Sequence, residues 1–350
     1  MGPPLVSIVV VNYNGQEHLA ECLSALSAGD PAVTAEVVVV DNASTDDSQA
    51  VIRSCQEADG GFKFLASPVN LGYAGGVNLA RPHLSGKYLA ILNSDVVVPS
   101  GWLAPIVEFM EATPAAAIVN PLIVLYSDEE RINAAGQNIH VTGLGFNRWL
   151  GAPRAQAGTA PQPVSGIHGS AFVIRREILE RAGGWEASGF LYHEDVELSW
   201  LMHLMGYDLY CLPLSTVRHK YHLTMYPEKL YLLERNRLAM LVTHLQKRSW
   251  LWLAPWLALT ELLMWGYCCL RGWRFLRAKA ASYGWLSQRW PALMEKRGQV
   301  QALRKRPDRT LLKRLCWGYA WDQFVTLGRE RGPSRRQPKG GLPVKLKERA

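Results

Sequence analysis

The amino-acid sequence predicts an α/β fold in which helices cover both faces of a parallel sheet. Apolar runs of strand length alternate with helical patterns over residues 7–95, an order typical of parallel sheets. Each of the four runs ends in polar residues, and in an open α/β sheet the carboxyl ends of the strands face the ligand crevice. The length of 350 residues allows one large domain or one to two ordinary ones, with a sizeable core.

The first strand is expected to begin at Ser7, in a β-branched run, and to break at Asn12–Gly15. A helical pattern follows, with apolar residues at Leu19, Cys22, Leu23 and Leu26. These two segments form the first strand-helix unit of the predicted sheet.

The second strand, Glu36–Val40, ends in the polar run Asp41–Asp46. Ser44 and Thr45 are expected to cap the helix that follows. Asp41 has two interpretations: its carboxylate could accept hydrogen bonds from the base or ribose of a nucleotide, or it could cap the helix after Ser44.

A glycine-rich turn, Asn70–Asn78, follows a third short strand at Phe62–Leu65. Backbone amides of Gly72–Gly76 could approach a phosphate closely, because glycine permits it and a helix N-terminus favours negative charge. The glycine spacing matches neither the dinucleotide-binding pattern nor the P-loop. The turn by itself is therefore weak evidence for a nucleotide.

The fourth strand begins at Tyr88 and ends abruptly at Asn93-Ser94-Asp95. An acid at the carboxyl end of a buried strand faces the crevice and not the core, so Asp95 is a candidate functional residue. The alternative is an ordinary turn or helix cap, because all three residue types favour turns.

The net charge of +8 conceals a strong asymmetry along the chain. Residues 1–270 contain 17 Lys and Arg against 25 Asp and Glu, whereas residues 271–350 contain 21 against 5. The two parts are expected to face different partners.

Cysteine usage and the N-terminus both favour the cytoplasm. The six cysteines include no Cys-x-x-Cys pair and no zinc-type spacing with histidine, which fits a reducing compartment. The N-terminus lacks the pattern of a secretory signal, so the catalytic part is expected to be cytoplasmic.

Several polar motifs occur in a characteristic order along the chain. They are Val11–Asn14, Asp41–Asp46, Asn70 and Gly72 with Asn78, Asn93–Asp95, Gly169–Arg176, Gly183–Trp185, His193–Glu197, Val217–His219 and Arg235-Asn236. In this order they resemble the inverting family 2 glycosyltransferases of the GT-A fold, the Rossmann-like fold of nucleotide-diphospho-sugar transferases. The similarity is closest to the rhamnosyltransferase-like, non-processive branch and covers about residues 5–240.

The resemblance implies a nucleotide-diphosphate sugar as donor, with Mg²⁺ or Mn²⁺ bridging its diphosphate. By resemblance Asp95 and His219 hold the metal; Asn93 stands where the family often has an aspartate, and His222 is a weaker candidate ligand. The implied donor-binding residues are Val11, Asn12, Tyr13, Asp41, Asn70, Gly72, Asn78, Asn93 and Ser94. A divalent cation suits this chemistry, because it neutralises the charge that develops on a leaving nucleoside diphosphate.

A second acidic pair, Glu194-Asp195, precedes an amphipathic helical pattern. By resemblance Asp195 is the general base and Glu194 orients it or contacts the acceptor. An aspartate at a helix start can take the acceptor's proton, although plain N-terminal helix acidity is the alternative. Glu197 and Leu201 replace the family's more usual aspartate and arginine, which we expect to affect acceptor-side packing.

Residues 126–166 are rich in Gly, Pro, Ala and Asn and are expected to form loops with a few short strands. Relatives place acceptor-binding loops here, and Trp149 and Trp185 could stack on a sugar ring, although both could equally be core aromatics. The processive signature Gln-x-x-Arg-Trp is absent, so a single sugar addition is expected.

Residues 250–270 are apolar enough to cross a bilayer, and a buried core helix is the rival interpretation. The domain before this run and the basic residues after it both belong on the cytoplasmic side, so a single crossing is disfavoured. We therefore expect a re-entrant or in-plane helix, kinked at Pro255. Arg271–Trp290 interleaves basic and bulky apolar residues, as in helices that bind anionic lipid.

The expected organisation is a GT-A domain over residues 1–240, divided into a donor half (1–125) and an acceptor half (126–240). Membrane-associated helices follow over 241–290, then a basic helical segment with a disordered tail over 291–350. The predicted protein is a peripheral or monotopic enzyme on the cytoplasmic face of the cell membrane. It would transfer one sugar, with dTDP-rhamnose as a candidate donor, to a lipid-linked or cell-surface glycan.

Three alternatives remain at this point. A nucleotidyltransferase would place a basic, glycine-rich loop after the first strand, and Asn12–Gly15 lacks the charge. A non-catalytic scaffold would have lost the carboxylates, and Asp95 and Asp195 are both present. Nucleic acid as the partner of the basic end ranks below membrane, because tryptophan-rich apolar runs have no role in phosphate binding.

Overall fold

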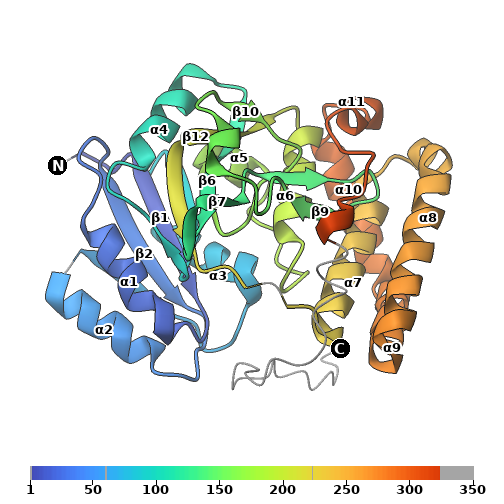
Figure 1. Cartoon of the computed structure of the whole chain (residues 1–350), viewed down its shortest axis with the longest axis horizontal. Coiled ribbons are helices and arrows are strands. Elements are labelled where there is room, and N and C mark those ends of the chain that lie inside the picture. Colours follow the sequence, from blue (N-terminus) through green and yellow to red (C-terminus); the bar gives the residue numbers. More distant parts are fainter. Residues whose placement is uncertain (1, 60, 223, 324–350) are drawn as a thin grey trace.

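A mixed β-sheet with helices on both faces forms the larger part of the molecule, and a layer of helices lies beside it (Figure 1). The structure is a computed structural model that describes residues 2–59, 61–222 and 224–323. The strands of the sheet are β1 (Val6–Asn12), β2 (Ala35–Asp41), β3 (Phe62–Ala66), β4 (Tyr88–Asn93), β5 (Val96–Val97), β6 (Ala116–Leu125), β7 (Asp128–Ala134), β10 (Gln162–Pro163), β11 (Ala171–Arg175) and β12 (Asp208–His219). A separate hairpin consists of β8 (Gln137–Ile139) and β9 (Gly145–Asn147).

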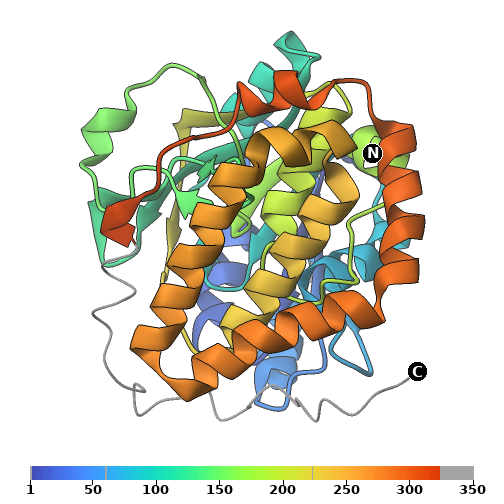
Figure 2. The same ribbon diagram turned by 90° about the vertical axis from the view of Figure 1, so that its right-hand side faces the viewer.

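The helices divide between the faces of the sheet and the C-terminal layer. They are α1 (Gln16–Ser27), α2 (Ser48–Asp59), α3 (Gly72–Ala80), α4 (Leu103–Ala112), α5 (Arg176–Arg181), α6 (Glu194–Leu204), α7 (Pro227–His244), α8 (Lys247–Arg271), α9 (Trp273–Gln288), α10 (Trp290–Leu303) and α11 (Asp308–Leu312), with short 3₁₀ turns η1 (Arg81–His83) and η2 (Arg154–Ala157). Figure 2 shows the layer of α7 to α10 from its outer side.

Strands β3, β2, β1 and β4 lie next to one another and are parallel, as the sequence predicts. Asn12 pairs with Asp41 across β1 and β2, and Val11 pairs with Asn93 across β1 and β4. The polar residues that end these strands therefore meet at one edge. The sheet is not parallel throughout, because β11 runs antiparallel between β4 and β6; the prediction of a parallel sheet holds for its N-terminal half.

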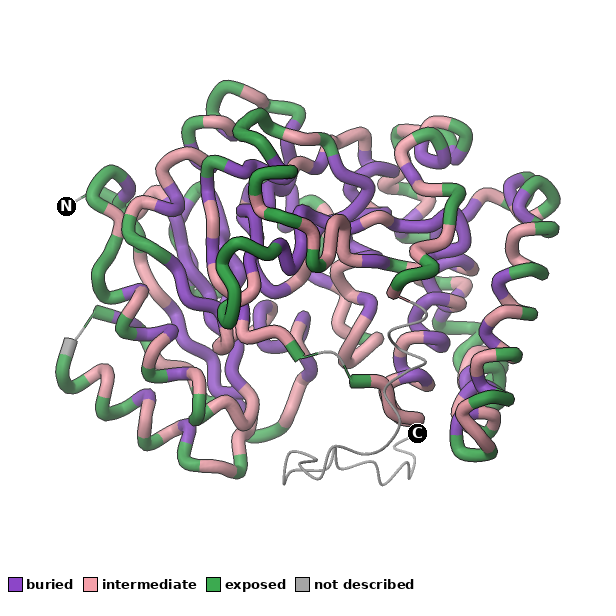
Figure 3. Tube along the Cα trace, viewed as in Figure 1, coloured by how far each residue is buried: buried purple, intermediate pink, exposed green. Residues whose placement is uncertain are grey.

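The core lies on both faces of this sheet, whose central strands β1, β4, β6 and β11 are almost wholly buried (Figure 3). Successive β1 residues alternate between the faces: Ile8 and Val10 pack with α1 and α4, whereas Val9 and Val11 pack with α3. Helix α1 buries Leu19, Cys22, Leu23 and Leu26, the four residues that the helical pattern predicts. A strand buried on both faces explains why β1 reads as a continuous β-branched run.

The predicted cap of α2 by Ser44 and Thr45 is wrong. The Ser48 amide, at the start of α2, donates to Asp46 Oδ1 at 3.1 Å. Ser44 Oγ instead accepts hydrogen bonds from Asn12 Nδ2 at 3.1 Å and from the Asn14 amide at 2.9 Å. The serine therefore connects the loops after β1 and β2, a contact between residues distant in sequence.

Helix α7 runs through position 240, where the sequence analysis places a domain boundary. Helix α8 continues through Pro255 and has the length and apolar composition of a membrane-spanning helix. The predicted disordered tail, at the end of the segment 291–350, lies outside the described residues.

Four charged side chains between α7, α8 and α9, three buried and one partly buried, hold the helical layer together. Arg237 of α7 donates from Nε to Glu234 Oε1 at 2.8 Å and from Nη2 to Glu261 Oε1 of α8 at 2.7 Å. Lys279 of α9, fully buried, pairs with both glutamates and lies 2.7 Å from Glu261 Oε2. Two positive and two negative charges balance, which offsets much of the cost of removing them from water.

This network determines which way two charged residues of the apolar region face. Glu261 faces the protein and is ion-paired, so it does not interrupt a lipid-facing surface. Lys279, expected among the lipid-facing basic residues, is buried. The charge of both residues serves the packing of the helices.

Glu234→Gln is expected to lower the free energy of unfolding by about 3–5 kcal/mol at neutral pH, because it leaves Arg237 and Lys279 incompletely paired in the interior. Burial raises the pKa of Glu234, but Arg237 and Lys279 outweigh it and bring the pKa to about 2. The stabilisation is therefore present above the ordinary carboxyl pKa of about 4.3 and is lost as the pH falls toward 2. Chemical denaturation of the detergent-solubilised protein at several pH values measures both effects.

Arg181→Gln is the matched control, because it breaks the exposed Arg181–Glu177 pair on α5. Its cost should stay below about 1 kcal/mol. Equal losses in the two variants would contradict the role assigned to the buried network.

Candidate active site

The loops after β1 and β2 form one side of the site. Asp41 is fully buried, and its carboxylate accepts hydrogen bonds from Asn12 Nδ2 at 3.2 Å, the Ser44 amide at 3.2 Å and Gln49 Nε2 at 2.8 Å. The carboxylate thus holds three protein groups in place. Its predicted contact with a nucleotide stays a prediction.

Asn12 reaches from β1 toward the end of β4. Its Oδ1 is buried without a hydrogen-bond partner, and a side chain at position 15 would overlap both this oxygen and Ser94 Oγ, so only glycine fits there. A buried unpaired carbonyl oxygen indicates a place for a ligand or water. Val11 is buried beside Gly76, Tyr13 is half-buried in the turn after β1, and Asn93 ends β4.

The glycine-rich turn packs tightly against the loop before α6. Gly72 has a φ of +75°, and a side chain there would overlap the Phe190 carbonyl oxygen. The Gly72 amide donates to Asn70 Oδ1 at 2.9 Å, and the Tyr73 amide donates to Phe190 O at 3.2 Å. This close approach is a packing reason for the glycine, and the proposed phosphate contact stays a prediction.

Asn78 fixes the segment that follows α5. Its Oδ1 accepts from the Trp185 amide at 3.0 Å, and its Nδ2 donates to the Trp185 carbonyl at 2.5 Å. Trp185 is 3% exposed and packs edge-on against Tyr73 and Phe172. The expectation that Trp185 stacks on a sugar is therefore wrong, whereas Trp149 is half-buried and its role stays open.

Asp95 and His219 face each other at the carboxyl edge of the sheet. His219, the last residue of β12, places Nε2 3.4 Å from Asp95 Oδ1. Its Nδ1 lies 2.8 Å from Asn133 Oδ1, a contact that orients the imidazole with Nε2 toward Asp95. Burial opposes ionisation of Asp95, but His219 outweighs it and lowers the pKa. His222 is exposed.

Asp195 lies in the first turn of α6 and is held by three donors. Oδ2 accepts from Gln137 Nε2 at 2.9 Å and the Gly169 amide at 3.1 Å, and Oδ1 accepts from the Val196 amide at 2.8 Å. Burial raises the pKa of Asp195, against the opposing effect of these hydrogen bonds. Burial and then the charge of Asp195 raise the pKa of Glu194, whose Oε2 is buried without a partner.

Three consecutive residues connect the two carboxylate centres. The His168 ring lies 5.7 Å from the His219 ring, the Gly169 amide binds Asp195, and the Ser170 carbonyl accepts from the Asn93 amide at 2.9 Å. Tyr73 donates from its hydroxyl to the Gly169 carbonyl at 3.0 Å. Asp95 and Asp195 therefore belong to one site.

The loop before α6 has strained backbone. Phe190, Tyr192 and His193 all have φ between +64° and +73°, a region that costs non-glycine residues energy and that clusters at functional sites. Asn236 of α7 stabilises the loop by donating Nδ2 hydrogen bonds to the carbonyls of Gly189, Leu191 and Tyr192, at 2.8–3.1 Å. Asp195 follows directly, so α7 contributes to its position.

Asn133, Gln137 and His168 were missed by the sequence analysis. Asn133 and Gln137 lie in the region expected to be irregular, where no pattern singled them out. His168 directly precedes the Gly169–Arg176 motif, so its neighbourhood was identified without its role. Among the described residues, no group of three or more His, Cys, Asp or Glu side chains converges as a metal cluster.

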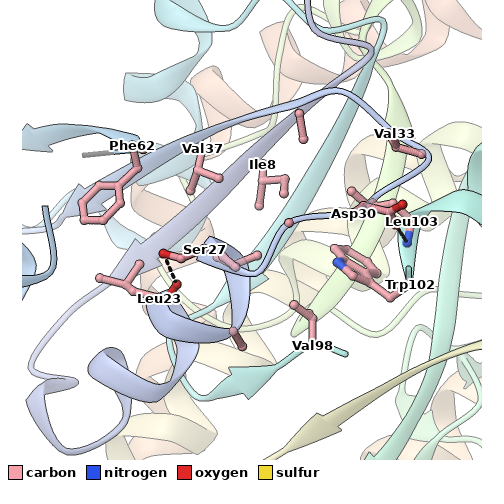
Figure 4. Close-up of a pocket in the computed structure, with 15 residues that line it drawn as sticks. Ile8, Leu23, Ser27, Asp30, Val33, Val37, Phe62, Val98, Trp102 and Leu103 are labelled. Carbon is pink, nitrogen blue, oxygen red and sulfur yellow. Dashed lines mark hydrogen bonds between the residues drawn. The ribbon is translucent and has the colours of Figure 1, made fainter. Parts of the chain in front are cut away.

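A pocket of about 370 Å³ lies elsewhere, between α1, the loop before α4 and the strands of the parallel half (Figure 4). Asp30 within it accepts hydrogen bonds from the Leu103 and Ala104 amides and so caps α4. None of the predicted site residues lines this pocket.

The fold is shared with solved structures that include a mannosyltransferase. The structure is similar to that of GalNAc-T7 with UDP, GalNAc and Mn²⁺ (TM-score 0.57, 18% identity, 69% of this chain and 48% of that chain). It is also similar to a mannosyltransferase from Pyrobaculum calidifontis in complex with GDP-Man and Mn²⁺ (TM-score 0.51, 22% identity, 95% and 89%). The chain belongs to Glycosyl transferase family 2, whose model matches residues 7–183.

Curated relatives are similar over parts of the chain. An N-acetylglucosaminyl-diphospho-decaprenol L-rhamnosyltransferase of Mycobacterium tuberculosis is 25% identical over 63% of this chain and 78% of its own length. A beta-monoglucosyldiacylglycerol synthase of Nostoc is 24% identical over 60% of this chain. The chain spans 43% of that synthase and 33% of an uncharacterized glycosyltransferase of Haemophilus influenzae, 28% identical over 31% of this chain.

Gly72→Ala is expected to destabilise the protein by more than about 1–3 kcal/mol, because the added methyl group requires an unfavourable φ and also displaces the Phe190 carbonyl. Gly101→Ala is the matched control: it has a similar φ of +78° but no atom within 4 Å of the new methyl group. Denaturation curves should show the larger loss for Gly72→Ala. Equal losses would mean that the close contact between Gly72 and the Phe190 carbonyl does not affect the free energy of unfolding.

Proposed function

We propose that this glycosyltransferase moves a single sugar, with inversion, from a nucleotide-diphosphate sugar to a lipid-linked or cell-surface glycan. The observation that carries the proposal is the bridge through residues 168–170, which brings Asp95 and Asp195 into one site. A transferase needs two such centres, one for the leaving diphosphate and one for the acceptor's proton.

On the donor side, Asp95 and His219 would hold Mg²⁺ or Mn²⁺. Three features fit a cation: a carboxylate, a nearby Nε2 lone pair, and a hydrogen bond from Nδ1 to Asn133 that orients the imidazole. Two protein ligands are enough for such a site when diphosphate oxygens and water supply the rest. When bound, the cation would neutralise charge on the departing diphosphate.

On the acceptor side, Asp195 would be the general base and Glu194 would orient the acceptor. The acceptor oxygen forms a bond to the anomeric carbon on the face opposite the diphosphate, and its proton passes to the Asp195 carboxylate. The bond from that carbon to the diphosphate breaks, and its electron pair leaves with the nucleoside diphosphate. A raised pKa makes Asp195 a better proton acceptor near neutral pH.

The acceptor and the donor sugar are inferred from relatives. The mycobacterial and Nostoc relatives are named for decaprenol-linked and diacylglycerol products, which supports a lipid-linked acceptor. Rhamnose is the donor sugar that fits the first of these, and dTDP-rhamnose is our candidate donor. Both carboxylates are present and held in place, which argues against a non-catalytic scaffold.

Asp195→Asn should keep metal-dependent nucleotide binding and lower the transfer rate by about 10²–10⁴-fold, because only the base is removed. Asp95→Ala should lose both. Calorimetric titration with UDP, GDP and dTDP, each with and without Mn²⁺, measures binding, and product formation from the matching sugar nucleotide measures transfer. A normal transfer rate in Asp195→Asn would overturn the mechanism.

The exposed side of α8 supports a peripheral or monotopic membrane location. Leu251, Trp252, Leu262 and Leu270 are 61–90% exposed, and the exposed residues between positions 251 and 270 include no charge within this fully described helix. At 1.5 Å per residue the stripe is roughly 30 Å long. A continuous apolar surface of this size marks an interaction site.

The opposite side of α8 is covered by protein. Leu253, Thr260, Met264 and Cys268 are buried along the same length of helix. A helix packed in this way lies in the membrane surface more readily than it crosses alone. Lys247, Arg248, Arg271 and Arg274 at its two ends would contact anionic lipid of the cytoplasmic leaflet.

Leu262→Glu is expected to weaken binding to vesicles of phosphatidylcholine and phosphatidylglycerol by about tenfold or more, because a buried leucine contributes about 1.5–3 kcal/mol. Leu214→Glu is the control: this leucine on β12 is 62% exposed, close to the 70% of Leu262, but lies away from α8. Vesicle co-sedimentation measures both. Equal binding by the two variants would move the membrane contact away from α8.

A further inference from the structure

A buried lysine of α10 reaches the two segments that flank Asp195. Lys296 Nζ lies 2.6 Å from Glu197 Oε1, on the first turn of α6, and 2.9 Å from Glu186 Oε2, in the segment before the strained loop. The lysine side chain is only 16% exposed. The net stability of an ion pair with so little contact with water depends on the geometry of its charged groups.

Four carboxylates lie within a short stretch of chain around the proposed base: Glu186, Glu194, Asp195 and Glu197. Among residues 2–59, 61–222 and 224–323, Lys296 is the one Lys or Arg within 4.0 Å of any of them. Glu194 Oε2 also has no hydrogen-bond partner, so few positive groups surround these four carboxylates. The single ammonium group therefore has a large share in balancing it.

We propose that Lys296 is a positioning residue of the transfer reaction, which fixes the start of α6 against the 186–193 segment and offsets negative charge beside Asp195. The inference rests on the proposed role of Asp195 as base. Helix α10 lies well outside residues 7–183, which match the family model. The C-terminal layer thus completes the acceptor side of the site as well as offering a membrane surface.

The electrostatics of the neighbours agree with this role. Burial raises the pKa of Glu186, but Lys296 outweighs it and brings the pKa to about 2. Burial also raises the pKa of Glu197, and there Lys296 opposes the rise without overcoming it. The charged or titratable groups of this cluster and of the elements packed against it are Tyr73, Glu186, Tyr192, Glu194, Asp195, Glu197, His244, Lys296 and Arg304.

Without the ammonium group, the negative charges of the neighbouring carboxylates are no longer offset. They should then raise the pKa of Asp195, because like charges beside a carboxyl disfavour its ionised form. Lys296→Met is therefore expected to move the acid limb of the plot of kcat/KM against pH to higher pH, by about one pH unit or more. At a given pH on that limb, kcat/KM would fall about tenfold. Lys296→Arg should keep the limb in place. Lys296→Met with Glu197→Gln removes one charge of each sign and should return the limb to its original position.

The measurement is the release of nucleoside diphosphate from UDP-glucose, GDP-mannose and dTDP-rhamnose with Mn²⁺, over a range of pH, by full-length protein. Lys279→Met is the matched control, because Lys279 is also buried between two glutamates, Glu234 and Glu261, but these lie on α7 and α8. It should destabilise the protein and leave the acid limb unchanged.

The outcomes separate the two proposals. Folded Lys296→Met with an unchanged acid limb overturns the inference while the proposed function stands. If Lys296→Met does not fold, the double variant decides, and a limb displaced by a pH unit in that charge-balanced protein overturns the inference. A wild type that is inactive with all three donors overturns the proposed function and this inference with it.

Discussion

The arrangement of the site depends on one short segment, residues 168–170, whose backbone and side chains contact both halves of the protein. The Gly169 amide holds the Asp195 carboxylate, the Ser170 carbonyl binds the end of β4, and the His168 ring packs on His219. These contacts fix the Asp195 carboxylate relative to the end of the parallel strands. An in-line displacement tolerates little error in that relation, because a misplacement of about 1 Å can cost 10²-fold in rate.

Residue patterns in the sequence predicted the parallel half of the sheet well. The β-branched runs of β1 and β2 and the apolar spacing of α1 are local signals, and the structure confirms them. The other half of the sheet, in which β11 runs antiparallel to both of its neighbours, was not predicted, because β6, β11 and β12 pair across long separations in sequence. Local patterns carry no information about such pairings.

The site residues that belong to sequence motifs could be predicted, whereas those outside the motifs could not. Asp95, His219, Glu194 and Asp195 all lie at the carboxyl edge or beside it. Asn133 and Gln137, which orient His219 and Asp195, come from β7 and β8, in a stretch of sequence without a motif. The prediction that Trp185 stacks on a sugar was wrong because the burial of Trp185 depends on Tyr73 and Phe172, which come from other elements. The prediction for Lys279 was wrong for a similar reason: partners on neighbouring helices determine which side of a helix faces inward.

The tethering of the loop before α6 also affects when the enzyme becomes active during its synthesis. A chain released from the ribosome as far as His219 contains both carboxylates and the whole sheet, but it lacks Asn236, which binds the strained 189–192 loop. A loop of left-handed residues without those hydrogen bonds has no reason to keep its conformation. We expect the nascent sheet to bind nucleotide before it can place Asp195, the proposed base, so that transfer begins only after the C-terminal helices have been synthesised.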